Sequence, residues 1–504
     1  MTTSAAAPGP SPETSPGIRA PGPAPDSPVV LDRRRRVTIL LVCCLSLLIV
    51  GMDNTIVNVA LPSIGHDFHT SVSGLQWTVD AYVLVLASLL MLSGSTADRL
   101  GRRRTFQVGL LLFTAGSLLC SLAPSLPLLV AFRMLQAVGG SMLNPVAMSI
   151  IRNTFHDPRE RAQAIGVWGA MMGISIALGP VVGGALTQSV GWRSIFWVNI
   201  PIGLTAIALT ARYVPESKAP NPRRPDLVGQ VLVIVVLASL TYAIIEGPSA
   251  GWGSPTITGL LATSAVSTAL LVGVERRRRE PLLDLRFFRS VPFTGATLIA
   301  VVAFATFGGF LFLNTLYLQE ARGMSALAAG LATLPLAGTT ALLAPVSGWL
   351  VGRYGPRPSL VIAGVLLVVA DLMLTGISKT TPLDWLLASY VLFGLGFGMV
   401  NPPITNTAVS GMPPAQAGVT SAIASTSRQV GQSLGVAVVG AAVTSDLHGP
   451  LGTALAAASH PGWWIMVVAS ALVLALGAAS TTSWARRSAL VAAEHLGADP
   501  LTGG

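Results

Sequence analysis

Five ionisable residues lie inside long apolar stretches of the sequence: Asp53, Asp80, Arg133, Asp371 and Arg428. Ionisable groups in such surroundings are costly, usually paired and usually functional. Burial disfavours the charged form of an aspartate, whereas a neighbouring arginine favours it. An aspartate held between these two effects can bind and release a proton near neutral pH. A pair between Asp53 and Arg133 is therefore the first candidate for a proton site.

Each of these residues also has a plainer interpretation. Asp53 and Arg133 could form a purely structural pair between two helices. Asp80 could share the proton or hold a cationic substrate, but its place near the end of an apolar stretch also fits a merely solvated acid. For Arg428 we favour contact with backbone carbonyls or with an acid across the helix bundle over contact with a substrate. Asp371 fits an interhelical contact.

The composition shows what the apolar stretches are. Of 504 residues, 52% are hydrophobic and only 10% are charged, whereas soluble proteins contain about 25% charged residues. This excludes a soluble enzyme. The formal net charge is +10, which in a membrane protein indicates basic cytoplasmic loops before it indicates nucleic acid as a partner.

The apolar stretches are long enough to cross a bilayer, which takes about 20 residues in a helix. We therefore expect an all-α membrane protein with fourteen transmembrane helices. The predicted spans are 37–61, 77–97, 105–123, 127–151, 162–187, 194–213, 227–246, 256–274, 291–318, 327–351, 358–377, 383–408, 416–444 and 461–483.

The basic residues predict the orientation of these spans. With the N-terminus inside, 26 of the 31 Lys and Arg residues fall on the inner side, three fall on the outer side, and Arg133 and Arg428 lie within spans. Basic loops stay in the cytoplasm, so we expect a multi-pass protein of the cell inner membrane with both termini cytoplasmic. Residues 1–36 form a Pro-rich tail predicted to be disordered, and 484–504 form a short cytoplasmic tail. The excess of Arg over Lys suggests a high-GC genome, as in actinobacteria.

The chain also repeats itself. Gly94–Arg102 resembles Gly348–Arg357 at an offset of 254, and Gly139–Pro145 resembles Gly396–Pro402 at an offset of 257. We expect two pseudo-symmetric six-helix bundles, 37–213 and 291–483, with two extra helices and linkers at 214–290. Repeated halves around a midplane site are typical of secondary transporters.

The two halves are not chemically equal. At an offset of 254, Asp53 corresponds to Phe307 and Asp80 to Leu334. The ion chemistry is therefore expected in the first half.

Two further motifs predict moving parts. An acid beside arginines between spans 2 and 3 is a candidate gate that pairs across the cytoplasmic seam; it comprises Gly94, Asp98, Arg99, Gly101 and Arg102. Small residues spaced four apart let helices approach closely, and a proline loosens a helix. In span 5 these residues are Gly169, Gly173, Gly179, Pro180, Gly183 and Gly184.

Other chemistries find little support. Neither lysine is preceded by glycine, as a phosphate-binding loop requires, and no nucleophile or zinc-enzyme motif occurs. His66 and His69 have metal-ligand spacing but lack partners beyond Asp67, so we expect no metal. We predict no enzyme, no cofactor and no nucleic-acid partner.

Seven motifs in order resemble one known family. They are Met52–Pro62, Gln76–Tyr82, Gly94–Arg104, Arg133–Gly140, Gly179–Gly184, Trp192–Pro201 and Arg428–Gly431. Together they resemble the major facilitator superfamily, and specifically its fourteen-span drug:proton antiporters of the EmrB/QacA type. The likeness covers roughly 37–485, and Ala137 stands where the family usually has Gly.

The resemblance implies the major facilitator fold and a proton-driven exporter that works by alternating access. The proton gradient would supply the energy, Asp53, Arg133 and Asp80 would couple it, and the bilayer, protons and a small amphipathic drug, antibiotic or secondary metabolite would be the partners of a monomer. The alternatives are a lipid or siderophore exporter, an importer of the same fold, or a non-transporting membrane sensor. The residues expected to line the substrate cavity are Tyr82, Gln136, Asn144, Trp168, Met172, Asn401 and Arg428.

Overall fold

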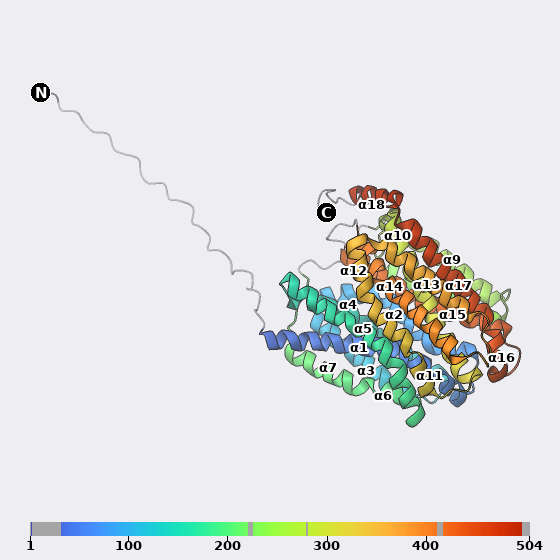
Figure 1. Ribbon diagram of the computed structural model, residues 1–504. Helices are drawn as coiled ribbons and strands as arrows, with labels where there is room; N and C mark the ends of the chain where they lie inside the picture. Colours follow the sequence, from blue (N-terminus) through green and yellow to red (C-terminus); the bar gives the residue numbers. More distant parts are fainter. Residues whose placement is uncertain (1, 3–31, 220–224, 279–280, 411–416, 496–504) are drawn as a thin grey trace.

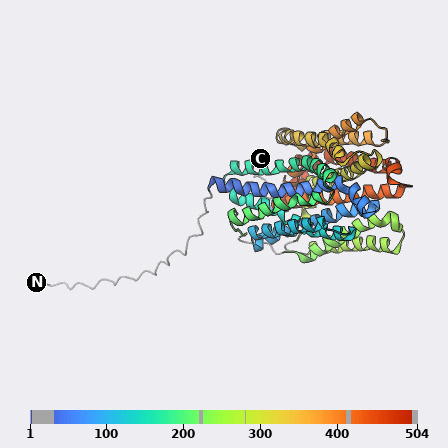
Figure 2. The same cartoon turned by 90° about the horizontal axis from the view of Figure 1, so that it is seen from below.

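A computed structural model describes residue 2 and residues 32–219, 225–278, 281–410 and 417–495. Within these ranges all regular structure is helical. Figure 1 shows the helices gathered into one bundle, and Figure 2 shows the long ones running roughly side by side. Most of the tail predicted to be disordered, residues 1–36, lies outside the described residues.

The helices before residue 280 form the first half and the inserted pair. The first half contains α1 (Arg33–Phe68), α2 (Val72–Leu100), α3 (Arg102–Ser121), α4 (Leu126–Thr154), α5 (Pro158–Ser189), α6 (Ser194–Trp197) and α7 (Asn199–Tyr213). The inserted pair is α8 (Leu227–Ala250) and α9 (Pro255–Glu275).

The helices after residue 280 form the second half. They are η1 (Leu285–Arg289), α10 (Val291–Leu316), η2 (Tyr317–Ala321), α11 (Ala326–Ala332), α12 (Leu334–Tyr354), α13 (Pro356–Leu374), α14 (Leu383–Val409), α15 (Ala417–Asp446), α16 (Leu451–Ala458), α17 (His460–Ser480) and α18 (Ser483–His495). The last of these falls in the predicted C-terminal tail.

Twelve helical stretches of the described chain are long and apolar enough to cross a membrane. The expected number was fourteen. The two remaining predicted spans coincide with α3 and with α15, which are not among the twelve. Three consecutive arginines open α3, and α15 carries Arg428 and many Ser, Thr and Gln residues, so both helices are less apolar than the rest.

The repeat detected in the sequence has a structural counterpart at the joints between helices. Gly101 joins α2 to α3 with φ +115°, and Gly355 joins α12 to α13 with φ +78°. Side chains rarely adopt such angles, which glycine tolerates. The same tight joint therefore recurs at the repeat offset in both halves.

The bundle has two ends, which we name by the residues of α1. At the Arg33 end, Arg36 pairs with Glu160 at the start of α5, and Arg35 donates to the carbonyl of Tyr213 at the end of α7 at 2.8 Å. At the Phe68 end, His66 lies 3.0 Å from Glu320 of η2. Because η2 continues α10, α1 and α10 run in the same direction.

The halves meet along two seams, and α1 also contacts α10 and α11 of the second half. In one, α2 packs against α15, and α8 contacts both helices while α9 packs on α8. In the other, α5 packs against α11 and α12. The inserted pair therefore covers the first seam.

The small residues of α5 let it pack closely against two helices, α1 and α11. A Cβ at Gly179 would overlap the side chain of Thr55 on α1, and a Cβ at Gly183 would lie 2.7 Å from Ile56. Gly184 instead faces the backbone of Ala326 on α11 of the other half. The close approach predicted for span 5 is present at these positions.

The remaining residues of the span 5 motif differ in their packing. A Cβ at Gly173 would lie 3.6 Å from Ala341, an ordinary contact with α12, and the Pro180 carbonyl faces Gly330. Around Gly169 there is open space. For Gly169 the prediction of close helix packing was therefore wrong, because the residue lies on an exposed part of α5.

Gly183→Ala is expected to lower the melting temperature of the purified protein, because the added methyl must displace Ile56 and overpacking costs about 1–3 kcal/mol. Gly169→Ala is the matched control on the same helix. It meets no atom and is expected to be neutral or to stabilise by about 0.5–1 kcal/mol, as alanine does in a helix interior. Thermal unfolding in detergent measures both. Equal melting temperatures for the two variants would contradict the packing described here.

Candidate functional site

The Asp53 carboxylate lies at the centre of a buried polar cluster in the first half. Its Oδ2 accepts a hydrogen bond from Nη1 of Arg133 on α4. Its Oδ1 accepts from Nε2 of Gln136 at 2.8 Å and from Nδ2 of Asn199 at 3.0 Å. Both partners of the ion pair are inaccessible to solvent, with exposed fractions of 0% for Asp53 and 1% for Arg133. The sequence prediction that these two residues meet is confirmed.

Arg133 is held by groups from several helices. Its Nε donates to the Thr78 carbonyl of α2 at 3.3 Å, and its Nη1 also donates to Oε1 of Gln136 at 2.8 Å. The guanidinium carbon lies 4.1 Å from the centre of the Tyr82 ring, a cation–π distance. The arginine therefore has a fixed position even apart from Asp53.

Two members of the cluster were not proposed as site residues from the sequence. Asn199 begins α7, and its amide bridges Asp53 and the Ser117 hydroxyl, 3.1 Å away on α3. Ser117 in turn donates to the Phe196 carbonyl at 3.0 Å. Asn199 is part of the Trp192–Pro201 motif, which was a usable signal, whereas nothing distinguished Ser117 within its apolar segment.

The arrangement fits an ionised carboxylate. An ionised Asp accepts hydrogen bonds and donates none, and here three donors converge on its two oxygens. A buried ion pair is tolerated only when its remaining polar atoms are also hydrogen-bonded. Binding a proton at Asp53 would remove an acceptor site and leave Arg133 without its counter-charge.

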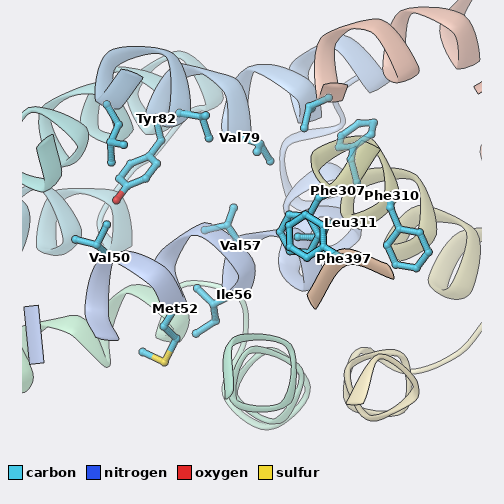
Figure 3. Close-up of a cluster of buried hydrophobic side chains, with 14 of the residues drawn as sticks. Val50, Met52, Ile56, Val57, Val79, Tyr82, Phe307, Phe310, Leu311 and Phe397 are labelled. Atoms are coloured by element: carbon cyan, nitrogen blue, oxygen red, sulfur yellow. The ribbon is translucent and has the colours of Figure 1, made fainter. Parts of the chain in front are cut away.

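The second half has aromatic side chains where the first half has this cluster. Phe307 takes the place of Asp53, and at the offset of 257 Tyr390 takes that of Arg133 and Phe393 that of Gln136. Phe310 stacks on Phe393 with ring centres 4.5 Å apart, and Phe307 stacks on Phe397 at 4.3 Å. Figure 3 shows Phe307, Phe310 and Phe397 in one buried cluster with Val57 and Tyr82 of the first half.

Asp80 lies apart from the Asp53 cluster. It is fully buried, so the interpretation as a solvated acid was wrong: α8 and α15 cover this part of α2. Ser433 of α15 faces the carboxylate, although neither Asp80 oxygen has a hydrogen bond of regular geometry. A small pocket beside it is lined by residues of α2, α8 and α15, among them Leu84, Thr241 and Ser433.

The residues expected to line a substrate cavity divide into two groups. Tyr82 and Gln136 are fully buried and belong to the Asp53 cluster. Asn144, Trp168 and Asn401 are only partly buried, and each has a polar side-chain atom without a partner. Met172 of α5 is exposed, with 38% of its surface accessible. In the second group the unpartnered polar atoms of Asn144, Trp168 and Asn401 are themselves buried, although their side chains are only partly so.

Arg428 of α15 is half-buried, and its guanidinium donates to hydroxyls. Nη2 donates to Thr405 of α14 at 2.7 Å and Nη1 to Ser425 at 3.3 Å, while Nε has no partner. The contact with carbonyls or with an acid that we favoured from the sequence was wrong. Asp371 does make the expected interhelical contact, accepting from Ser470 of α17 at 2.6 Å.

The candidate gate loop is tied to its own half. Arg102 donates to Asp98 at 2.9 Å, one helical turn away, and Arg99 is exposed. Gly94 has only Pro145 within contact range of a Cβ.

Gly101 makes the tight joint between α2 and α3. The carboxylate of Glu216 accepts from the backbone N–H groups of Arg103 and Arg104 at the start of α3. Sequence reasoning missed Glu216, which lies 113 residues after the loop it caps.

Metal binding has no support in the described part of the chain, where no three His, Cys, Asp or Glu residues cluster. His66 lies against Glu320 rather than pairing with His69.

The sequence of the chain is similar to those of known proteins. A sequence model of the Major Facilitator Superfamily matches residues 43–436. The chain is 38% identical to multidrug resistance protein Stp of Mycobacterium tuberculosis over 83% of this chain and 78% of that protein. It is 37% identical to the tetracenomycin C resistance and export protein of Streptomyces glaucescens, over 81% of this chain and 76% of the relative. It is 36% identical to the multidrug efflux pump LfrA of Mycolicibacterium smegmatis, over 81% and 80%.

Solved structures share the fold. A bacterial homologue of the human lysosomal transporter Spinster, in an inward-facing and occupied conformation, matches with a TM-score of 0.62 and 18% identity, over 92% of this chain and 98% of that chain. A D-xylose–proton symporter matches with a TM-score of 0.64 and 17% identity, over 88% and 97%. At these identities the likeness concerns the fold alone.

Arg133→Gln is expected to lower the free energy of unfolding by about 3–5 kcal/mol, because it leaves the buried Asp53 carboxylate without its counter-charge. Asp53→Asn combined with Arg133→Gln removes both charges and is expected to be more stable than Arg133→Gln alone. Melting temperatures of the single and double variants in detergent give the order. A double variant as unstable as the sum of its single variants would show that the two residues act independently.

Proposed function

We propose that this chain, which belongs to the major facilitator superfamily, exports amphipathic drugs, antibiotics or secondary metabolites in exchange for protons. The observation that carries the proposal is the fully buried Asp53 carboxylate, paired with Arg133 and hydrogen-bonded to Gln136 and Asn199. A carboxylate in such a site can bind one proton and thereby change the contacts among three helices, α1, α4 and α7. The printed functions of relatives, drug efflux and antibiotic resistance and export, support the direction and the class of cargo.

The fourteen-span subtype, of the EmrB/QacA type, is part of the proposal. At about 1.5 Å per residue, the 20 residues of α3 and the 30 of α15 are long enough to cross the bilayer core of about 30 Å. Both pack lengthwise on helices that are apolar enough to span, α3 on α4 and α15 on α10. The arginines at the start of α1 and α3 support a cytoplasmic position for the Arg33 end, since basic segments stay in the cytoplasm.

The present conformation fits the state that receives cargo from the cytoplasm. Hydrogen bonds join the halves at the Phe68 end: Gln76 donates to the carbonyls of Val436 and Ala437, at 3.1 and 2.9 Å. Towards the Arg33 end, α5 exposes Gly166, Val167, Gly169 and Ala170, on either side of the partly buried Trp168. A helix exposed over several of its faces has lipid on one side and space toward the other half on another.

Exchange would follow from the charge at Asp53. When the halves part at the Phe68 end, a proton from outside binds the carboxylate, and its hold on Arg133 and Asn199 weakens. The cluster binds its helices less tightly once Asp53 is protonated, and the cargo leaves to the outside. When the transporter returns to the present conformation, Asp53 releases the proton to the cytoplasm. The membrane potential contributes about 2.3 kcal/mol per charge per 100 mV, so no cofactor is needed, and a monomer contains every part.

The cargo would lie between the halves, near the partly buried side chains of Asn144, Trp168 and Asn401. Asn144 and Asn401 occupy equivalent positions of the repeat on α4 and α14. With the Trp168 indole and the Met172 thioether they combine few polar atoms with apolar surface, as small-molecule sites do. An adaptable surface of this kind accepts several related amphipathic molecules.

In everted membrane vesicles with an acid interior, adding a transported compound is expected to release protons from the lumen, and Asp53→Asn is expected to abolish the release. Asp371→Asn is the matched control, because Asp371 is an equally buried acid that binds Ser470 far from the cluster. Fluorescence of a pH-sensitive dye measures the release across a panel of dyes and antibiotics.

The outcomes separate the candidate proton sites. Release that persists in Asp53→Asn but is lost in Asp80→Asn would move the proton site to Asp80. Release that is lost equally in Asp371→Asn would show a general loss of structure. Inserted wild-type protein that responds to no compound of the panel would contradict drug:proton antiport with these compounds.

A further inference from the structure

The helix α10 ends in one turn of π-helix, η2 (called the π-turn below), whose side chains contact both halves. Single π-helical turns are rare and occur frequently at functional sites. On one side η2 is fixed to the second half: the Tyr317 hydroxyl donates to the Ser378 carbonyl at 2.6 Å, and the guanidinium of the following Arg322 donates to the Thr381 carbonyl. Both acceptors lie in the loop between α13 and α14.

On its other side η2 contacts the first half. Gln319 donates from Nε2 to the Val59 carbonyl of α1 at 2.8 Å. Oε1 of the adjacent Glu320 lies 3.0 Å from Nε2 of His66, also on α1. Two consecutive side chains of the π-turn therefore bind two successive stretches of α1, and so join the second half to the first.

The stretch of α1 that they hold is locally loosened. Pro62 lies inside α1 between the two contact points, and a proline lacks the N–H that would bind the carbonyl four residues earlier. Contacts from η2 on both sides of Pro62 brace α1 where its own hydrogen-bond ladder is interrupted.

We propose that Gln319 and Glu320 are positioning residues that latch the two halves at the Phe68 end and must release for the transporter to open outward. The inference rests on the proposed alternating access. The latch adds two polar side chains of the π-turn to the packing of α5 on α11, where Gln188 also accepts from the Leu327 N–H at 3.4 Å.

The test measures opening directly and does not depend on transport. Ala329→Cys places a thiol on α11, on the side of Ala326 that meets α5, where the side chain is only 2% exposed. The native Cys43, Cys44 and Cys120 are buried in spans, so a membrane-impermeant maleimide added to intact cells reports the new thiol against the parent protein. Labelling after denaturation normalises for the amount of protein.

Gln319→Ala in the Ala329→Cys background is expected to raise the labelling rate roughly two- to tenfold, the effect of losing one hydrogen bond that favours the closed state. Glu320→Ala in the same background is expected to raise the rate less, because the His66 side chain is 76% exposed and exposed pairs contribute little. Glu320→Gln retains an acceptor for His66 and is expected to restore much of the protection. Asp67→Asn is the matched control: it breaks an ion pair to Arg193 of 2.8 Å at the same end of the bundle but within the first half, and it is expected to leave the labelling rate unchanged.

Unchanged labelling in both alanine variants would overturn the latch, as would an equal increase in Asp67→Asn. Labelling of Ala329→Cys in everted vesicles but never in intact cells would overturn its outer placement. Faster labelling in the latch variants, together with wild-type protein that moves no protons with any compound, would leave the latch standing and count against drug:proton antiport. The two proposals therefore fail in different ways.

Discussion

One buried negative charge organises the first half. A carboxylate in the membrane interior is costly unless it is paired and hydrogen-bonded, and Asp53 meets this condition only where α1, α4 and α7 converge. Ser117 adds α3 by accepting from Asn199, and Tyr82 adds α2 by covering the Arg133 guanidinium. The relative positions of five helices thus depend on one charge. A change in that charge is felt by all of them, which is what coupling a proton to a conformational change requires.

The second half repeats the frame without the charge. Gly101 and Gly355 make equivalent joints with positive φ, yet the positions of Asp53, Arg133 and Gln136 carry Phe307, Tyr390 and Phe393. Stacked aromatic rings have no protonation state near neutral pH and need no counter-charge. The proposed proton site therefore belongs to the first half alone. Duplication supplied the architecture, and the ion site depends on the half that kept charged residues.

Sequence reasoning succeeded where a physical cost leaves a mark in the residues. Apolar runs located the twelve helices that the described chain has long and apolar enough to span a membrane, although fourteen were expected. An acid and an arginine alone in apolar surroundings identified the Asp53–Arg133 pair. It left alternatives open where the decisive fact is the neighbour. For Asp80, a role with the proton or a cationic substrate stood beside a solvated acid, because its distance from the end of a span does not reveal that α8 and α15 cover it. Ser117 carried no signal, because a serine in an apolar helix is common. Glu216 acts on a loop more than 100 residues earlier, and spacing along the chain cannot reveal such a contact.

The helix α1 connects the proposed proton site to the contacts between the halves. It carries Asp53, the Val59 carbonyl and His66 within 14 residues, a distance of about 20 Å at 1.5 Å per residue. One end of this segment is held by the polar cluster of its own half and the other by the π-turn of the opposite half. Pro62 interrupts the hydrogen-bond ladder between them, so the two ends need not move as one rigid rod. A shift of α1 that follows the loss of charge at Asp53 would reach the latch through fewer than four turns of helix, whereas α8 and α9 lie outside this route. The inserted helices cover the seam between α2 and α15. The helix α1 is one element through which the proposed proton site can act on the opposite half, and α2 is another, because it contacts Arg133 and also bonds α15 through Gln76.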